Sequence, residues 1–169
     1  LHYPLRRQRQ MCIRDSDEIV QVIQNLVDNG IKYSPAGGVV EVAIHRDLGI
    51  DAAPGPRTDG TTRLSLLSPD RDAGVLYAAI SVRDHGPGLA REHLPRLTER
   101  FYRVEGQKSG ERAGTGLGLA IVKHIVNRHR GGLAVESAPG EGAVFRAYFP
   151  LAGVRSALVR SPELAEPSP

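Results

Sequence analysis

Polar side chains on one helix-forming stretch could together hold a cation and a phosphate group. Asn25 and Asn29 lie one helical turn apart, beside Asp28 and Lys32. Amide oxygens suit a hard cation, and amide and ammonium groups donate hydrogen bonds to phosphate. Asparagine is a poor residue for a helix interior, which favours a functional role. An ordinary solvent-exposed polar face explains the same pattern, so both interpretations stay open on these residues alone.

A second candidate is the glycine-rich start of another helix. Residues 114–118 read Gly-Thr-Gly-Leu-Gly, and an apolar helical run follows at once. Glycine lets a ligand approach the unpaired N–H groups of a first turn, where the helix dipole favours an anion such as phosphate. The run is neither a GxxxxGK[ST] loop nor a GxGxxG that follows a strand. A tight turn with close packing is the alternative explanation.

The third candidate is a carboxylate, Asp84, at the end of an apolar strand. It follows Ile80 and Val82 on the same strand face, so it is expected to end a buried face and to need a partner. Asp84 could accept a hydrogen bond from a ligand, with Gly86 and Gly88 clearing room. A simple turn aspartate is the other explanation, because His-Gly-Pro-Gly follows it.

Hydrophobic periodicity and turn residues predict the elements that would position these groups. In chain order we expect a helix from Asp17, a strand at 39–45, a long loop at 47–74 with a short strand at 64–67, a strand at 75–84, a short helical stretch at 92–99 broken at Pro95, a helix from the glycine run to about 130, and a hairpin of strands 133–137 and 142–149. The long loop is either disordered or functional. Residues 104–113 lack any period and are expected to form a mobile lid.

Length and composition bound the protein class. At 169 residues with 40% hydrophobic content, the chain is expected to be one domain with tails, and its net charge of +3 gives no reason to expect nucleic acid. A single cysteine excludes an intrachain disulfide, and no membrane-spanning run or signal peptide is apparent. We expect residues 1–16 to be a basic linker or a non-native stretch, 17–151 to be the domain, and 152–169 to be a flexible tail.

The motifs in this order resemble the ATP-binding catalytic domain of bacterial sensor histidine kinases, in the GHKL ATPase/kinase superfamily. The resemblance covers about residues 17–151. The similar segments are NLVDNGIKYS at 25–34 (the N box), DHGPG at 84–88 (the first glycine box), ERFYR at 99–103 (the F box) and GTGLG at 114–118 (the second glycine box). The sequence of residues 95–104 and 123–126 is most similar to that of phosphate-regulon sensor kinases.

The resemblance implies an α+β fold: a two-layer α/β sandwich of the Bergerat type, with a mixed sheet and helices on one face. It implies ATP and Mg²⁺ as cofactors, with Asn25 holding Mg²⁺ and Asp84 accepting the adenine amino group. The residues implied as catalytic are Asn25, Lys32 and Arg103. The residues implied to bind the nucleotide are Asn29, Lys32, Tyr33, Asp84, Gly86, Gly88, Phe101, Arg103, Gly114, Thr115, Gly116, Leu117 and Gly118.

Departures from the family pattern limit what the chain is expected to do alone. No histidine is followed by an acidic residue, so the phosphoacceptor helix pair is expected to be absent, and the helix and strand upstream of the N box do not fit into residues 1–16. We therefore expect the catalytic half of a histidine kinase, truncated at its N-terminal edge and lying in the cytoplasmic portion of a membrane-anchored kinase. Its expected partners are a histidine-containing dimerisation domain and, downstream, a response regulator, with no nucleic-acid or membrane contact by this segment.

Two other functions stay open from the sequence. A GHKL-type ATPase of the gyrase, Hsp90 or MutL kind is disfavoured, because those relatives place a glutamate base at the position of Asn25, and asparagine cannot take a proton from water. A non-catalytic nucleotide-binding module is disfavoured by the intact motifs.

Overall fold

The computed structural model describes residues 3–70, 74–104 and 114–155, and its five strands form one antiparallel sheet. The elements are α1 (Tyr3–Tyr33), β1 (Glu41–Leu48), β2 (Thr62–Leu67), β3 (Val75–Asp84), the 3-10 helix η1 (Arg91–Arg96), α2 (Gly118–Arg128), β4 (Gly132–Ser137) and β5 (Ala143–Arg155). The strand order is β1-β3-β5-β4-β2. The expected α+β class is confirmed.

The predicted mixed sheet is wrong for the described residues, because every pair of neighbouring strands is antiparallel. β3 and β4 are joined through α2 and run in the same direction, but β5 lies between them and runs against both. Strand direction therefore alternates across the whole sheet.

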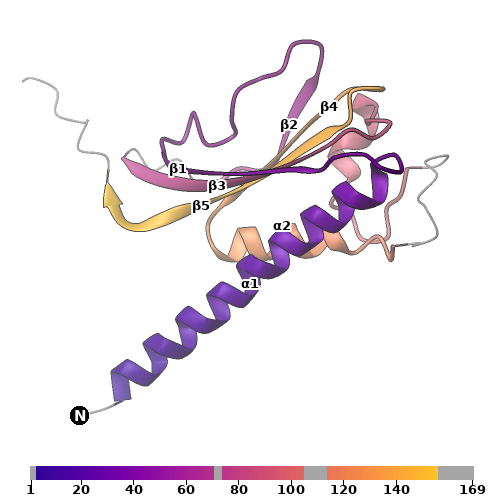
Figure 1. Cartoon of the computed structure of the whole chain (residues 1–169). Coiled ribbons are helices and arrows are strands. Elements are labelled where there is room, and N and C mark those ends of the chain that lie inside the picture. The colour runs from indigo at the N-terminus through magenta and orange to yellow at the C-terminus, as the bar shows by residue number, and fades with distance from the viewer. Residues whose placement is uncertain (1–2, 71–73, 105–113, 156–169) are drawn as a thin grey trace, which may run out of the picture.

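Both α-helices pack on one face of the sheet, as expected (Figure 1). The core between them is aliphatic: Val22 and Leu26 of α1 and Val122 of α2 are 0–1% exposed. Glu18 binds the two helices together, since its carboxylate oxygens lie 2.8 Å from Arg128 Nη1 and 2.9 Å from His129 Nε2. This clamp fixes where the polar face of α1 lies relative to the start of α2.

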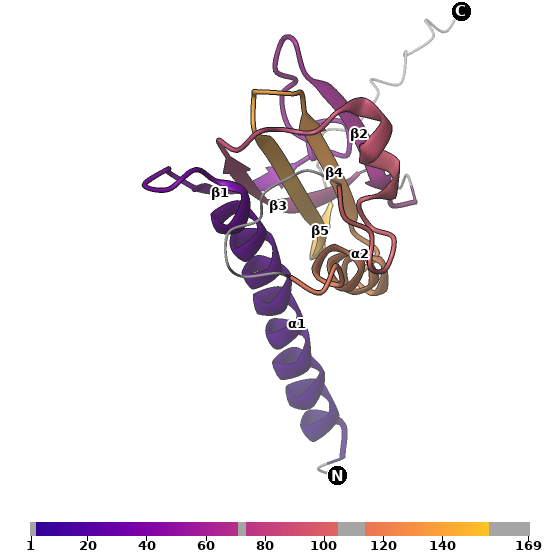
Figure 2. The same cartoon turned by 90° about the vertical axis from the view of Figure 1, so that its right-hand side faces the viewer.

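Two helix boundaries differ from prediction. α1 begins at Tyr3 rather than near Asp17. The basic stretch before Asp17 shows no hydrophobic periodicity, but it consists largely of Arg, Gln, Leu and Met, which have high helix propensity. In Figure 2 the N-terminal half of α1 extends away from the sheet. α2 ends at Arg128, two residues before the expected end at about 130.

The strands match prediction most closely where they are buried. β3 has the predicted bounds, and β4 and β5 form the predicted hairpin. β5 continues to Arg155, past the expected domain end at 151. β1 starts two residues later than expected and is an edge strand, with Ile44 69% exposed. The expected lid lies outside the described residues except for Val104, and so does the expected tail beyond Arg155.

The long loop between β1 and β2 packs on the face of the sheet opposite the helices (Figure 1). Ala53 is fully buried there with Tyr77 and Tyr148, whose rings meet edge to face at 5.8 Å. The loop is thus part of the packed structure, and β2 at its end is the short strand that the sequence suggested.

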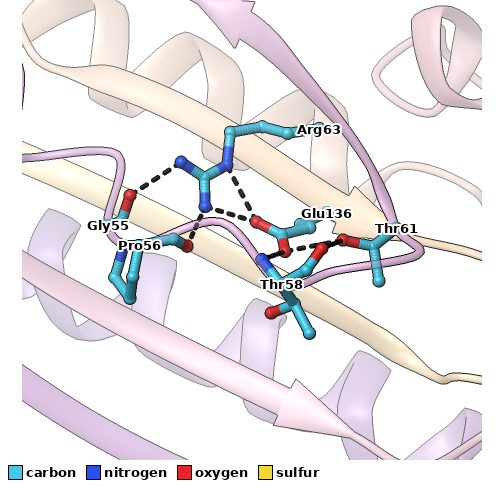
Figure 3. Close-up of polar contacts among 6 residues, drawn as sticks. All are labelled: Gly55, Pro56, Thr58, Thr61, Arg63 and Glu136. Carbon is cyan, nitrogen blue, oxygen red and sulfur yellow. Dashed lines mark hydrogen bonds and ion pairs between the residues drawn. The ribbon is translucent and has the colours of Figure 1, made fainter.

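Glu136 anchors this loop through a buried ion pair (Figure 3). Its carboxylate pairs with the Arg63 guanidinium and accepts hydrogen bonds from the Thr61 hydroxyl at 2.7 Å and the Thr58 N–H at 2.5 Å. Arg63 in turn donates to the carbonyl oxygens of Gly55, at 2.7 Å, and of Pro56. Burial would raise the pKa of the Glu136 carboxyl, but these hydrogen bonds outweigh it and lower the pKa from 4.5 to about 2.

We predict that Glu136→Gln lowers the free energy of unfolding at neutral pH by about 1–3 kcal/mol, because it leaves the Arg63 charge unpaired. The native pKa lies below the unfolded one, so ionised Glu136 stabilises the fold above about pH 4.5 and this contribution is lost as pH falls toward 2. Urea denaturation across this range should give a flatter pH dependence for the variant. The exposed Glu141→Gln is the matched control, and superimposable curves for wild type and Glu136→Gln would contradict the prediction.

Candidate functional site

A cavity of about 940 Å³ is lined by residues from the end of α1, the start of α2 and the turn after β3. Figures 1 and 2 show these three segments at the same end of the sheet. This volume falls in the range of roughly 300–1,000 Å³ that is usual for small-molecule sites. The predicted residues that line it are Asn25, Asn29, Lys32, Tyr33, Asp84, Gly88, Arg103, Gly114, Thr115, Gly116 and Gly118. Segments from α1 to β5 that are far apart in sequence are thus brought together.

The Asn25 side chain is oriented by its own helix. Its Nδ2 donates to the Gln21 carbonyl oxygen at 2.9 Å, so the amide oxygen is left for another partner. That oxygen points at the start of α2, because a Cβ built on Gly118 would lie only 3.0 Å from it. Glycine at 118 therefore keeps an amide oxygen and a helix N-terminus in close approach without an intervening side chain.

Lys32 lies across the cavity mouth against the second glycine-rich segment. A Cβ on Gly114 would lie 2.8 Å from Lys32 Nζ, and the same ammonium lies 4.9 Å from the ring centroid of Tyr33. The cation thus faces the backbone just before α2, where unpaired N–H groups also favour an anion. The predicted cationic and glycine-rich parts of the site are adjacent in space.

Asp84 ends the apolar face of β3, as predicted, and is 6% exposed. Its Oδ1 accepts hydrogen bonds from the Gly86 N–H at 2.9 Å and the Ala143 N–H at 3.3 Å. Burial raises the pKa of the carboxyl, and the two backbone hydrogen bonds and the charges of His85 and Arg83 oppose that rise. Among the described residues no hydrogen bond uses Oδ2, so one acceptor oxygen is left for a ligand in the cavity.

Two glycines keep the backbone close around this aspartate. A Cβ on Gly86 would lie 2.4 Å from the Tyr33 carbonyl oxygen. Gly88 has φ +68°, and a Cβ there would lie 1.9 Å from the Ala138 carbonyl oxygen. Neither position accepts a side chain without movement of the backbone, so the first glycine motif has a steric function independent of any ligand.

Three predicted site residues do not line the cavity: Gly86, Phe101 and Leu117. Gly86 acts through its hydrogen bond to Asp84. Leu117 is the residue immediately before α2. Phe101 has φ 65° and a side chain that is 69% exposed, and it meets the site through its backbone, whose N–H donates to the Gly116 carbonyl oxygen at 3.0 Å. The structure therefore places the Phe101 ring outside the cavity.

The cavity wall also contains residues that the sequence analysis did not assign to the site. They are mainly apolar side chains near the motifs, namely Ile31, Leu89, Leu97, Val104, Leu119 and Phe145. Ser34 is there too, and its Oγ is buried with no hydrogen-bond partner among the described residues. The position of Ser34 within the N box could have assigned it to the site from sequence. The apolar residues could not have been assigned in this way, because apolar residue types fit the hydrophobic core equally well.

Comparison with known proteins identifies the class of domain. Residues 14–153 match the family described as histidine kinase-, DNA gyrase B- and HSP90-like ATPases. The match covers most of the chain and includes every element that lines the cavity. The chain therefore belongs to this family, and the cavity belongs to an ATP-binding domain.

The relatives specify the branch of the family. The chain is 37% identical over 146 residues to the phosphate regulon sensor protein PhoR of Pseudomonas aeruginosa, covering 86% of this chain and 27% of that protein. It is 33% identical to the sensor histidine kinase WalK of Bacillus subtilis, covering 80% and 18%. Among solved structures, the mycobacterial sensor histidine kinase MprB aligns with a TM-score of 0.54 and 28% identity, covering 80% of this chain and 71% of that one. The domain is thus the catalytic ATP-binding domain of a sensor histidine kinase, and it spans about a quarter of the length of PhoR.

We predict that Asp84→Asn weakens binding of the adenine base and leaves the fold intact. The amide oxygen can still accept from the Gly86 and Ala143 N–H groups, while the Nδ2 group replaces the free acceptor with a donor. ATP affinity should fall about ten- to hundredfold, and the preference for ATP over GTP should narrow, because guanine presents a carbonyl oxygen where adenine presents an amino group. Calorimetry with both nucleotides measures this, with the exposed Asp51→Asn as control. Unchanged ATP affinity in Asp84→Asn would exclude the role of Asp84.

Proposed function

We propose that this domain transfers the γ-phosphate of ATP to a histidine of a separate phosphoacceptor domain. The observation that carries the proposal is the pairing of Asn25 with the start of α2, with Lys32 at the glycine segment beside it. This arrangement supplies donors, a cation and a helix N-terminus at one end of a cavity whose other end holds Asp84. Phosphoryl transfer requires mainly such positioning and charge neutralisation.

The donor set fits a bound Mg²⁺ that is shared with phosphate oxygens. Asn25 Oδ1 is one protein oxygen available for it, and Mg²⁺ usually keeps waters and takes only one or two protein ligands. No group of three or more His, Cys, Asp or Glu side chains that could hold a metal occurs within the described ranges, which agrees with a site completed by the nucleotide. When bound, the ion would neutralise phosphate charge, and Asn29 and Lys32 would hold the phosphates.

Arg103 would act on the transferred group. It lines the cavity at the root of the segment between η1 and α2. A guanidinium can hold two oxygens of a phosphate at once, so it suits the charge that develops at the γ-phosphate. We expect Arg103 to contribute more to transfer than to ground-state binding of ATP.

The main competing function, ATP hydrolysis, would need a general base, and residue 25 does not supply one. Asn25 lies at the position where a hydrolase would need a group that accepts a proton from water, and its amide cannot do so. Asp28 also lines the cavity and is the remaining carboxylate on this face of α1. Phosphate release that depended on Asp28 would favour hydrolysis over transfer.

The activity test supplies this chain with a phosphoacceptor domain from a related sensor kinase and ATP labelled in the γ position. Label should appear on the acceptor histidine and not on this chain. Asn25→Ala should abolish transfer because the amide oxygen is lost. Arg103→Ala should lower the transfer rate by a larger factor than it weakens ATP binding. Gln24→Ala, an exposed amide one residue from Asn25, is the matched control.

Two results would overturn the kinase proposal. Robust phosphate release without an acceptor, above that of Asn25→Ala, would favour an ATPase. If the chain binds Mg²⁺–ATP but labels no histidine of any acceptor domain offered, only a nucleotide-binding module remains.

We also propose the surroundings of the domain. Residues 17–151 form the functional unit, which acts in the cytoplasmic portion of a sensor kinase beside a histidine-containing dimerisation domain and upstream of a response regulator. The support is the names of the relatives and the family match, which begins at residue 14. No helix in the described parts of the chain has both the length and the apolar character needed to cross a bilayer.

Deleting residues 1–14 should leave the melting temperature unchanged within error. Glu18 fastens α1 to α2 from within the remaining helix, and the family match needs almost none of the deleted stretch. Thermal unfolding followed by circular dichroism measures this. Deletion of residues 1–18, which also removes Glu18, is the comparison and should lower the melting temperature. A clear drop on deleting 1–14 alone would show that these residues stabilise the domain.

A further inference from the structure

A second, smaller pocket lies on the face of the sheet opposite the helices. It has a volume of about 160 Å³ and is separate from the nucleotide cavity, with no lining residue in common. This volume is too small for a nucleotide but large enough for a tetrahedral ion with some water. The loop after β1 covers the pocket, with Pro54, Pro56 and Thr58 in its wall.

The strand register places two arginines side by side in this pocket. Arg146 of β5 is directly opposite Ser81 of β3, and Arg83 follows Ser81 by two residues on the same strand face. The two arginines are therefore diagonal neighbours, within reach of one ligand for side chains of this length. Ser81 also lines the pocket and is the residue on β3 that both arginines neighbour.

Neither arginine forms an ion pair within the described part of the chain. Arg83 Nε is buried without a hydrogen-bond partner. No ion pair or hydrogen bond to Arg146 occurs there either. Burial lowers the pKa of the Arg146 guanidinium, the like charge of Arg63 lowers it further, and Glu136 opposes this.

The acidic residues of the pocket are already engaged. The Glu136 carboxylate pairs with Arg63 and accepts hydrogen bonds from Thr58 and Thr61. Glu41 lies across from Arg83 in the register, but its Oε1 is 2.8 Å from His85 Nε2. The pocket thus contains three arginines and two carboxylates, which leaves a net charge of +1, and Arg83 and Arg146 are the two arginines without an ion pair among the described residues.

The roof of the pocket is held in place before any ligand arrives. Arg63 donates to the carbonyl oxygens of Gly55 and Pro56, and Glu136 accepts from the Thr58 N–H (Figure 3). A Cβ on Gly55 would lie 2.2 Å from the Arg146 guanidinium carbon, so the loop backbone rests directly on this side chain. A preformed enclosure reduces the ordering cost of binding a small ion.

We propose that this pocket binds a small free oxyanion of the size and charge of phosphate. Arg83 and Arg146 hold its oxygens, with the Ser81 hydroxyl as a third donor. A paired guanidinium site suits a tetrahedral anion with several acceptor oxygens better than a monovalent one. The site does not depend on the nucleotide cavity, so it stands or falls separately from the kinase proposal.

The test titrates the ¹⁵N-labelled full chain with inorganic phosphate at constant ionic strength, with chloride as the balancing anion. Saturable shifts are expected at the amides of Gly55, Thr58 and Ser81. Arg146→Gln and Arg83→Gln should each weaken this binding at least tenfold. Arg46→Gln removes an exposed arginine of β1 outside the pocket and should bind as the wild type does. Acetate, with one charge and two oxygens, should bind at least tenfold more weakly than phosphate.

The variants should fold, since each removes a charge that makes no ion pair within the described residues. Arg146→Gln should melt in phosphate-free buffer at or above the wild-type temperature, and phosphate should raise the melting temperature of the wild type but not of this variant. If Arg146→Gln does not fold, Arg83→Gln decides the question by the same shifts. The proposal is overturned if phosphate shifts only nucleotide-cavity amides such as Gly116, if the effect of Arg46→Gln equals that of the pocket variants, or if acetate binds equally well.

Discussion

The close approach of α2 to the polar face of α1 is the constraint on which the rest of the site depends. Gly118 is near enough to Asn25 that a Cβ would lie 3.0 Å from the amide oxygen. The aliphatic core between the helices and the sheet sets this separation, and Glu18 holds it through an ion pair with Arg128 and a hydrogen bond with His129 at the other end of α2. A hydrophobic interface thus places an amide oxygen, which suits a cation, beside unpaired N–H groups, which suit an anion.

Strand β3 contributes to both faces of the sheet through the alternation of its side chains. Asp84 ends the face that packs under the helices, and its neighbour Arg83 points to the opposite face. The two pockets therefore lie back to back across one strand end. Each contains a buried charge without a full set of partners, and such groups are more often found at binding sites than in the core.

The local sequence pattern was enough to predict the features that depend on residues close together in the chain. β3 was predicted with its observed bounds because its alternation runs between clear turn signals, and the cavity residues fell into recognisable motifs. Long-range contacts could not be predicted in the same way. The packing of the loop after β1 rests on Arg63 and Glu136, which are 73 residues apart, and the arginine pocket requires the register of several strands. The outward Phe101 ring follows from a backbone angle that residue type does not reveal.

Paramagnetic broadening would test the central claim, that the α1–α2 junction is the metal and phosphate end of the cavity. Mn²⁺ can replace Mg²⁺ at oxygen sites, and it broadens nearby resonances in the ¹⁵N-labelled chain. With a non-hydrolysable ATP analogue and trace Mn²⁺, the side-chain amide of Asn25 and the backbone amide of Gly118 should broaden first, and the amides beside Asp84 should broaden much less. Broadening centred on Asp84, or none that depends on the nucleotide, would contradict the assignment.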